Sequence, residues 1–216
     1  MGYGDKEYWN KRYLLSVETY DWFCKYDEFK DDILPMLKVT GKGGEGVQET
    51  RLRKRSDIRV LVIGCGNSDL SESLFNDGFC DITSVDYSEV VVQKMQKLHK
   101  GKEGLRFEVM DIREMKFETE SFDVIIDKGN LFPLFNNSAT LDSVLCGSDS
   151  AKTANAILAE CSRVLKKGGY FFVISHGQPS TRLNYLEKGV FKWKVKHQAL
   201  CKVRYLYCML KNLRTT

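Results

Sequence analysis

The stretch R-V-L-V-I-G-C-G-N-S-D, residues 59–69, contains the pattern that decides the fold. Its first half is a short run rich in apolar and β-branched residues, which predicts a buried strand. Gly64 and Gly66 follow at once and predict a turn, after which Asp69 is expected to cap a helix with Glu72 as its capping-box partner. A strand, a Gly-x-Gly turn and a helix in this order are typical of sites where a nucleotide-like ligand lies against a helix N-terminus.

The same alternation continues towards the C-terminus. Further helices are predicted at residues 88–100 and 153–165, and strands at residues 81–85, 105–109, 122–126 and 170–174. Lys166-Lys-Gly-Gly169 is expected to break the last helix before its strand. Strands that alternate with amphipathic helices favour right-handed crossovers, so we expect an α/β fold with a doubly wound, mostly parallel sheet.

An aromatic region precedes this alternating part. Helices are predicted at residues 5–15 and 27–37, and Trp9 and Tyr13 lie four residues apart, on one face of the first helix. On the residues alone, Trp9, Tyr13 and Trp22 are interpreted as core aromatics.

Glycines and basic residues are concentrated in residues 40–56. We expect a flexible loop there, which is either a solvated insertion or a basic arm that docks an acidic partner. The predicted organisation is therefore an aromatic helical region at residues 1–39, this loop, and one domain at residues 57–216.

The C-terminal tail is strongly basic, with eight Lys and Arg and no Asp or Glu from residue 188 onwards. Residues 191–197 alternate between apolar and polar side chains, and residues 203–210 form a second extended run, so an antiparallel pair at the sheet edge is predicted. Lys192, Lys194 and Lys196 share one face; they either protect an edge strand from unwanted pairing or form a docking surface for an acidic macromolecule.

Composition limits the possible classes of protein. The 216 residues are 43% hydrophobic and 29% charged, with a net charge of +4, which fits one globular domain and does not indicate a dedicated nucleic-acid binder. No apolar run has the ~18–20 residues of a membrane span, and the N-terminus does not look like a signal peptide. The seven scattered cysteines suggest free thiols in a reducing cytoplasm, with neither disulfides nor a metal site.

Polar side chains follow the predicted strands at the edge where ligands bind in such sheets. Asp86 could accept hydrogen bonds from two ribose hydroxyls, and Tyr87 offers a flat face for adenine. Asp111 could accept from the adenine amino group while Ile112 packs the ring, although Asp111 also fits an ordinary turn or cap. A dinucleotide fingerprint needs a third glycine at position 69, where Asp69 stands, so the pattern suits a ligand without phosphates and disfavours a nicotinamide dehydrogenase.

Taken together, these motifs resemble a class I S-adenosylmethionine-dependent methyltransferase. The pieces that carry the resemblance are V-L-V-I-G-C-G-N-S, S-V-D-Y-S, V-M-D-I-R, S-F-D-V-I-I-D-K-G and S-R-V-L-K-K-G-G-Y-F, in that order. With E-Y-W-x-x-R-Y and Y-D-W-F near the N-terminus, the chain is similar to the lysine methyltransferases that act on elongation factor 1-alpha. This resemblance covers nearly the whole chain and implies a seven-stranded, Rossmann-like sheet whose N-terminal helical region forms a lid.

The resemblance also implies which residues bind S-adenosylmethionine and its product S-adenosylhomocysteine. The matching positions are Trp9, Tyr13, Trp22, Gly64, Asp86, Tyr87, Asp111, Ile112 and, through its backbone, Lys128; Gly66 joins them because it allows close approach of the backbone. One departure is local. The subgroup reads D-K-G-T-L-D-A where this chain reads D-K-G-N-L-F-P, so Phe132 replaces an acid in the loop that faces the methyl acceptor in this fold.

The predicted activity is methyl transfer to a lysine amine of a protein, with elongation factor 1-alpha as the expected partner. Asp127 is the candidate carboxylate that orients the amine, or it only holds the cofactor. His176 is the candidate proton acceptor, or it is an ordinary loop histidine. The alternatives are a methyltransferase for a small molecule or another protein group, and a catalytically silent module that binds S-adenosylmethionine.

Overall fold

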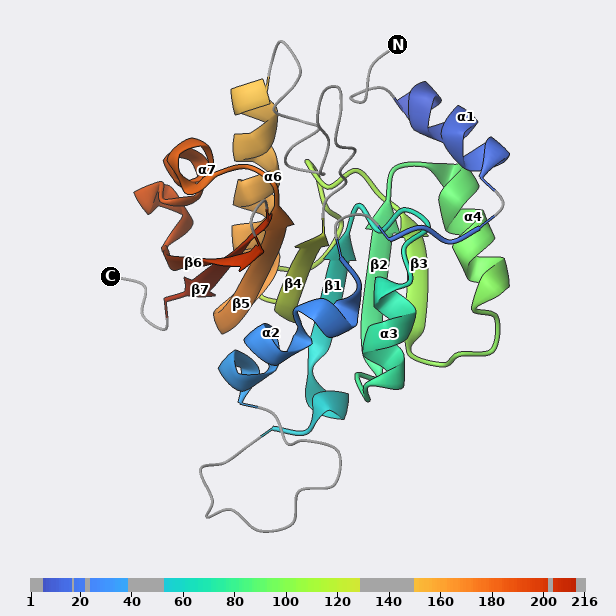
Figure 1. Ribbon diagram of the computed structural model, residues 1–216, viewed down its shortest axis with the longest axis horizontal. Helices are drawn as coiled ribbons and strands as arrows, with labels where there is room; N and C mark the ends of the chain where they lie inside the picture. The colour runs from blue at the N-terminus through green and yellow to red at the C-terminus, as the bar shows by residue number, and fades with distance from the viewer. Residues whose placement is uncertain are drawn as a thin grey trace.

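The computed structural model describes residues 6–16, 18–21, 24–38, 53–128, 150–201 and 204–212. Within them a seven-stranded sheet has the order β3-β2-β1-β4-β5-β7-β6 (Figure 1). The strands are β1 (Arg59–Ile63), β2 (Asp81–Asp86), β3 (Leu105–Val109), β4 (Phe122–Lys128), β5 (Leu165–Ser175), β6 (Trp193–Cys201) and β7 (Arg204–Lys211). The first five strands are parallel, whereas β7 runs antiparallel to β5 and β6, so the predicted mostly parallel sheet with an antiparallel C-terminal edge is confirmed.

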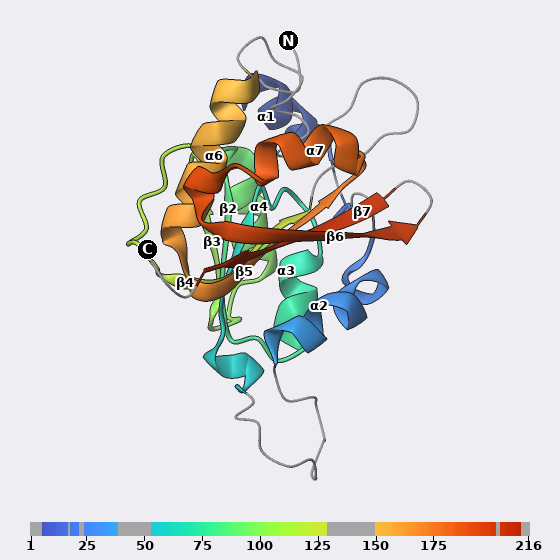
Figure 2. The ribbon, with the colours of Figure 1, turned by 90° about the vertical axis from the view of Figure 1, so that its left-hand side faces the viewer.

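Helices cover both faces of the sheet, as Figures 1 and 2 show. They are α1 (Lys6–Leu15), α2 (Lys30–Leu37), α3 (Leu70–Asn76), α4 (Glu89–Leu98), α6 (Ser150–Val164) and α7 (Pro179–Leu186), with short 3-10 turns η1 (Tyr26–Glu28), η2 (Arg55–Asp57) and η3 (Gly189–Phe191). One apolar core joins α2, α3 and α4 to one face of the sheet, and a second core joins α6 and α7 to the other. Side chains alternate along β5, so the strand contributes to both cores: Phe171 packs on the α6 side and Phe172 on the other.

Local details depart from the predictions. The predicted capping box does not form: Asp69 makes no side-chain cap bond, and Glu72 pairs with Lys102 instead. The helix before β5 ends at Val164, as expected, but residues 166–169 already belong to the strand. Gly168 adopts a positive φ of 74° where the pairing with β4 shifts register. Glycine is favoured both at β-bulges and directly after helices, because both positions can require a positive φ. The two patterns therefore look alike in sequence.

Two arginines of the predicted basic loop lie within the described residues, while residues 39–52 lie outside them. Arg53 pairs with Asp123 at 2.8 Å, and Arg55 pairs with Asp77 at 2.6 Å. These two side chains therefore anchor the end of the loop to the domain. The division of the chain into residues 1–39, 40–56 and 57–216 stays a prediction.

The basic tail forms the sheet edge. Lys194 and Lys196 are exposed on β6, the outermost strand, while Trp193 of the same strand is buried against α7 and donates its indole N–H to the carbonyl of Leu186 at 2.7 Å. None of the helices in the described part of the chain combines the length and the apolar character that crossing a membrane requires.

Candidate functional site

The glycine turn after β1 is tied to the end of β2. Gly64 and Gly66 both have positive φ, 58° and 50°, a conformation that other residues adopt only with strain. This conformation aims the N–H of Gly66 at the Asp86 carboxylate, 3.0 Å away, and the N–H of Ser88 donates to the other carboxylate oxygen at 2.9 Å. The turn and the carboxylate therefore form one unit at the carboxyl ends of two neighbouring parallel strands.

Asp86 is a perturbed acid. Its residue is only 5% exposed, and burial raises the pKa of its carboxyl group to about 6, although backbone N–H groups, including those of Ser88 and Gly66, lower it. With Tyr87, three backbone N–H groups face the carboxylate, which has about four acceptor sites, so some acceptor capacity remains. A buried carboxylate at a strand end, with spare acceptor capacity, is suited to a ligand that donates from hydroxyl groups.

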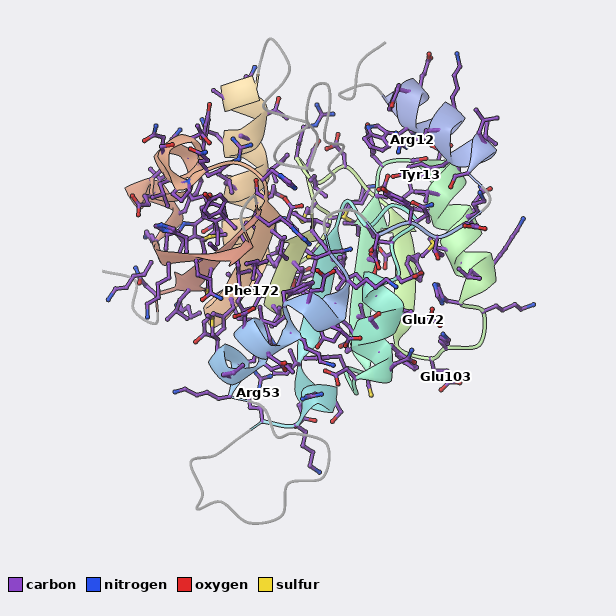
Figure 3. All side chains as sticks on the ribbon, viewed as in Figure 1. Arg12, Tyr13, Arg53, Glu72, Glu103 and Phe172 are labelled. Carbon is purple, nitrogen blue, oxygen red and sulfur yellow. The ribbon has the colours of Figure 1, made fainter. Side chains whose placement is uncertain are left out.

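Two aromatic residues of α1 lie over this turn. A Cβ atom added to Gly66 would lie 2.8 Å from the Tyr13 hydroxyl, so only glycine leaves room for that side chain. Trp9 stacks on Tyr13 with ring centroids 5.7 Å apart, and both are buried. In Figure 3, Tyr13 lies between α1 and the strand ends. Trp9 and Tyr13 are buried, as core aromatics would be, and Tyr13 also lies against the glycine turn, as a lid residue would. Trp22 lies outside the described residues.

Bonds to the domain hold α1 in this place. The Ser88 hydroxyl, which caps α4, donates to the side chain of Asn10 at 2.5 Å. Lys94 of α4 donates to the carbonyls of Tyr13, at 3.0 Å, and of Ser16, at the C-terminal end of α1. A cation at that position complements the helix dipole.

An open cleft of about 870 Å³ borders the ends of β2 and β3, lined among others by Tyr87, Met110, Asp111 and Arg113. Arg113 grips the Asp111 carboxylate with its guanidinium, at 2.5 Å for the nearest pair, and holds the pKa of that carboxyl below its usual value. Ile112, in contrast, is buried in the core on the α6 side. The sequence predictions missed Arg113, and the only signal for it was its position two residues after Asp111.

The remaining predicted residues follow β4 and β5. The ammonium of Lys128 contacts the Asp21 carboxylate and the carbonyl of Cys24, the latter at 3.1 Å, so its side chain has a role besides the expected backbone one. Asp127 is fully buried and contributes, after burial, to raising the pKa of the Cys161 thiol in α6. His176 follows directly after β5 and is partly exposed.

The structure thus gathers most predicted residues at one edge of the sheet. Gly66, Asp86 and Tyr13 form a single contact group with Gly64 two residues earlier in the same turn, and Tyr87 and Asp111 line a cleft at the ends of β2 and β3. Lys128 lies at the same edge, because Ile63 pairs with Asp127 and the chain continues from these partners into Gly64 and Lys128. Asp127 and Lys128, being neighbours in a strand, point to opposite faces of the sheet.

The chain is similar to known proteins over most of its length. Residues 54–210 match the family model of a methyltransferase domain. The chain is 34% identical over 198 residues to EEF1A lysine methyltransferase 4 of Bos taurus, covering 91% of this chain and 70% of that protein. It is 33% identical over 180 residues to the eEF1A lysine and N-terminal methyltransferase of Homo sapiens, covering 82% of this chain and 22% of that protein.

Among solved structures, a protein of Pyrococcus horikoshii OT3 superposes with a TM-score of 0.63 over 94% of this chain and 99% of its own, at 16% sequence identity. That likeness shows the fold alone. The family model and the sequence relatives go further: this chain belongs to the class I S-adenosylmethionine-dependent methyltransferases, in the subgroup of the EEF1A lysine methyltransferases.

Proposed function

We propose that this protein transfers a methyl group from S-adenosylmethionine to a lysine amine of elongation factor 1-alpha. The observation that carries the proposal is the match to EEF1A lysine methyltransferase 4 over 91% of the chain. A cytoplasmic location is part of the same proposal, since translation elongation takes place there.

The residues at the sheet edge fit the cofactor. The buried Asp86 carboxylate at the end of β2 has acceptor capacity for ribose hydroxyls, and it lies beside a glycine turn that is covered by Tyr13. Tyr87 and Asp111 would hold the adenine in the cleft, with Ile112 supporting Asp111 from the core. Gly64, Lys128, Trp9, Tyr13 and Trp22 would surround the methionine end; of these, Trp22 rests on the family motif alone.

Bound S-adenosylmethionine supplies an electrophilic methyl group on a sulfonium. The task of the protein is to bring a neutral amine in line with it, and positioning of this kind can contribute about 7–11 kcal/mol. A lysine amine has an unperturbed pKa of roughly 10.4, so it must lose its proton first. Buried aromatic rings such as Trp9 and Tyr13 exclude water and favour the neutral amine. His176, at the end of β5, is our candidate proton acceptor.

Asp127 stays the candidate for orienting the amine or for only holding the cofactor. Its complete burial and its position across the sheet from Lys128 favour the second of these roles. If Asp127 only holds the cofactor, Asp127→Asn will raise the apparent KM for cofactor without a separate loss in kcat. A selective loss in kcat would assign it to the amine.

Purified elongation factor 1-alpha and cofactor labelled in the methyl group provide the test. The expected result is label on one lysine of the elongation factor, located by mass spectrometry of its peptides. Asp86→Asn should abolish most of the labelling. Asp81→Asn is a matched control, because Asp81 lies at the other end of β2 in surface ion pairs with Arg59 and Arg106. Label that enters only small molecules, or that survives in Asp86→Asn, would contradict the proposal.

A further inference from the structure

A buried ion pair lies beside the glycine turn. Lys128 has only 2% of its side chain exposed, and its ammonium contacts the carboxylate of Asp21, whose side chain is 11% exposed. The carbonyl of Cys24 accepts a further bond from the same ammonium at 3.1 Å. Burying two charges is costly unless they stay paired, so removal of one partner leaves the other as an uncompensated buried charge.

Asp21 comes from a short strap, residues 18–21, that follows α1 and crosses the glycine turn. The N–H of Tyr20 donates to the carbonyl of Asn67 at 2.9 Å. The side-chain amide of Asn67 donates in return to the carbonyl of Glu18 at 2.7 Å. These reciprocal bonds fix the strap to the turn and bring the Asp21 carboxylate to the mouth of the site.

The Asp21 carboxylate joins three parts of that mouth. The hydroxyl of Ser68, the last residue of the turn motif, donates to the Asp21 carboxylate at 2.5 Å. The same carboxylate oxygen contacts the Lys128 ammonium. One acidic oxygen thus links the strap, the turn and the end of β4. Lys128 and Gly64 follow paired residues at the same edge of the sheet. The ion pair of Asp21 and Lys128 therefore lies where the methionine end of the cofactor is proposed to bind.

The charge of the cofactor changes in the reaction. S-adenosylmethionine carries a positive sulfonium, whereas S-adenosylhomocysteine has a neutral thioether and is otherwise equally charged. A lysine ammonium near this sulfur disfavours the methyl donor relative to the product, and a carboxylate beside that ammonium offsets the penalty. For unit charges within about 10 Å and an effective dielectric of about 20, the Coulomb energy changes a binding constant on the order of tenfold.

We infer that Asp21 is a positioning residue which offsets the charge of Lys128 and thereby favours binding of S-adenosylmethionine over S-adenosylhomocysteine. This inference rests on the proposed function, because it assigns the charge pair to the cofactor site. Asp21 touches Lys128 and Ser68 and acts on the cofactor through them. A purely structural role would change the affinity for both ligands by the same factor.

Titration calorimetry with the two ligands, at low salt, measures the ratio of the two dissociation constants. In Asp21→Asn, the affinity for S-adenosylmethionine should fall about tenfold more than the affinity for S-adenosylhomocysteine. In Lys128→Met, where the carboxylate stays and the ammonium is lost, the ratio should shift in the opposite direction, towards the methyl donor. The opposite signs make the test independent of any general loss of affinity, and either variant decides it if the other does not fold.

Asp123→Asn is the control for loss of a buried ionic network. Asp123 is equally protected, with 8% of its side chain exposed, and pairs with Arg53 and Lys166 at the opposite end of β4. It should lower the melting temperature and leave the ratio unchanged. A constant ratio in Asp21→Asn and Lys128→Met, or an equal shift in Asp123→Asn, would overturn the inference. If the unchanged protein binds neither ligand, the proposed function is refuted and the inference falls with it.

Discussion

The ionisation of Asp86 should control how tightly this protein holds its cofactor. Burial raises the pKa of the Asp86 carboxyl to about 6. Ribose hydroxyls donate hydrogen bonds to the ionised form, so binding selects the ionised protein and a proton competes with the ligand. Affinity should therefore fall as the pH drops through 6 and reach a plateau above it.

The size of the effect follows from the pKa. At pH 5, one unit below a pKa of about 6, roughly ten protonated molecules exist for each ionised one, so the apparent Kd should be about elevenfold weaker than the plateau value. At pH 7 only about a tenth of the molecules are protonated, and the affinity should be within about 10–20% of the plateau.

Calorimetric titration with S-adenosylhomocysteine at pH 5, 6 and 7 and constant ionic strength provides the measurement. The charges of that ligand do not change in this range, because its carboxyl titrates lower and its amine higher. Asp86→Asn should bind at least about tenfold more weakly at pH 7, since charge-assisted hydrogen bonds are lost, and its affinity should not depend on pH. A flat profile in the unchanged protein, or a slope that survives in Asp86→Asn, would refute the reasoning.

Stability provides an internal control for the same variant. Because the folded pKa of Asp86 lies above the value of about 4 in the unfolded chain, ionised Asp86 destabilises the fold, by about 3 kcal/mol, a cost that develops as the pH rises from about 4 to 6. Asp86→Asn removes this cost, but its amide must face one of the two backbone N–H groups, which costs about 1–3 kcal/mol. Urea unfolding at pH 7 should therefore give a free energy of unfolding within about 2 kcal/mol of the unchanged protein.

Three further outcomes are expected. Gly66→Ala should lower the free energy of unfolding by about 1–2 kcal/mol and weaken cofactor binding, because Gly66 has a positive φ and the new methyl group would lie 2.8 Å from the Tyr13 hydroxyl; adding Tyr13→Phe should recover part of the binding, and no recovery would contradict the steric cause. Burial lowers the pKa of His99, so folding stability should decrease as the pH falls below about 6.5, and less so in His99→Gln, as urea unfolding at pH 7 and pH 5.5 would show. Tyr26→Phe should cost about 1–3 kcal/mol, because the buried Tyr26 hydroxyl donates to Asp77 at 2.8 Å; an unchanged melting temperature would mean that this bond contributes nothing.

Sequence patterns predicted the regular elements well because those patterns are local. The apolar run at residues 59–63 and the alternation after it depend on neighbouring residues, and each predicted strand exists in the sheet. The sequence places Val91, Val92, Met95 and Leu98 on one face of α4, yet Leu98 is 58% exposed while the other three are buried. The next residue, His99, is buried in its place and stacks on Phe107, so periodicity alone does not show which side of the last turn meets the core.

Part of the candidate site was equally accessible from sequence. The rule that ligands bind at the carboxyl ends of parallel strands was enough to select Asp86, Tyr87 and Asp111. That rule does not give side-chain partners. The grip of Arg113 on Asp111 could have been suspected from their spacing, whereas the pairing of Lys128 with a residue over a hundred positions away could not.

The order of elements, the position of the glycine turn and the acids after each strand were determined by the sequence itself, because hydrophobic periodicity and turn chemistry act over a few residues. Only the tertiary structure decided which charges meet: Asp21 with Lys128, Arg53 with Asp123, and Glu72 with Lys102 in place of a cap. Such pairs form when the packing of distant segments brings the charged groups within about 4 Å. The sequence does not show which of many carboxylates a given lysine or arginine will meet, because that depends on the packing.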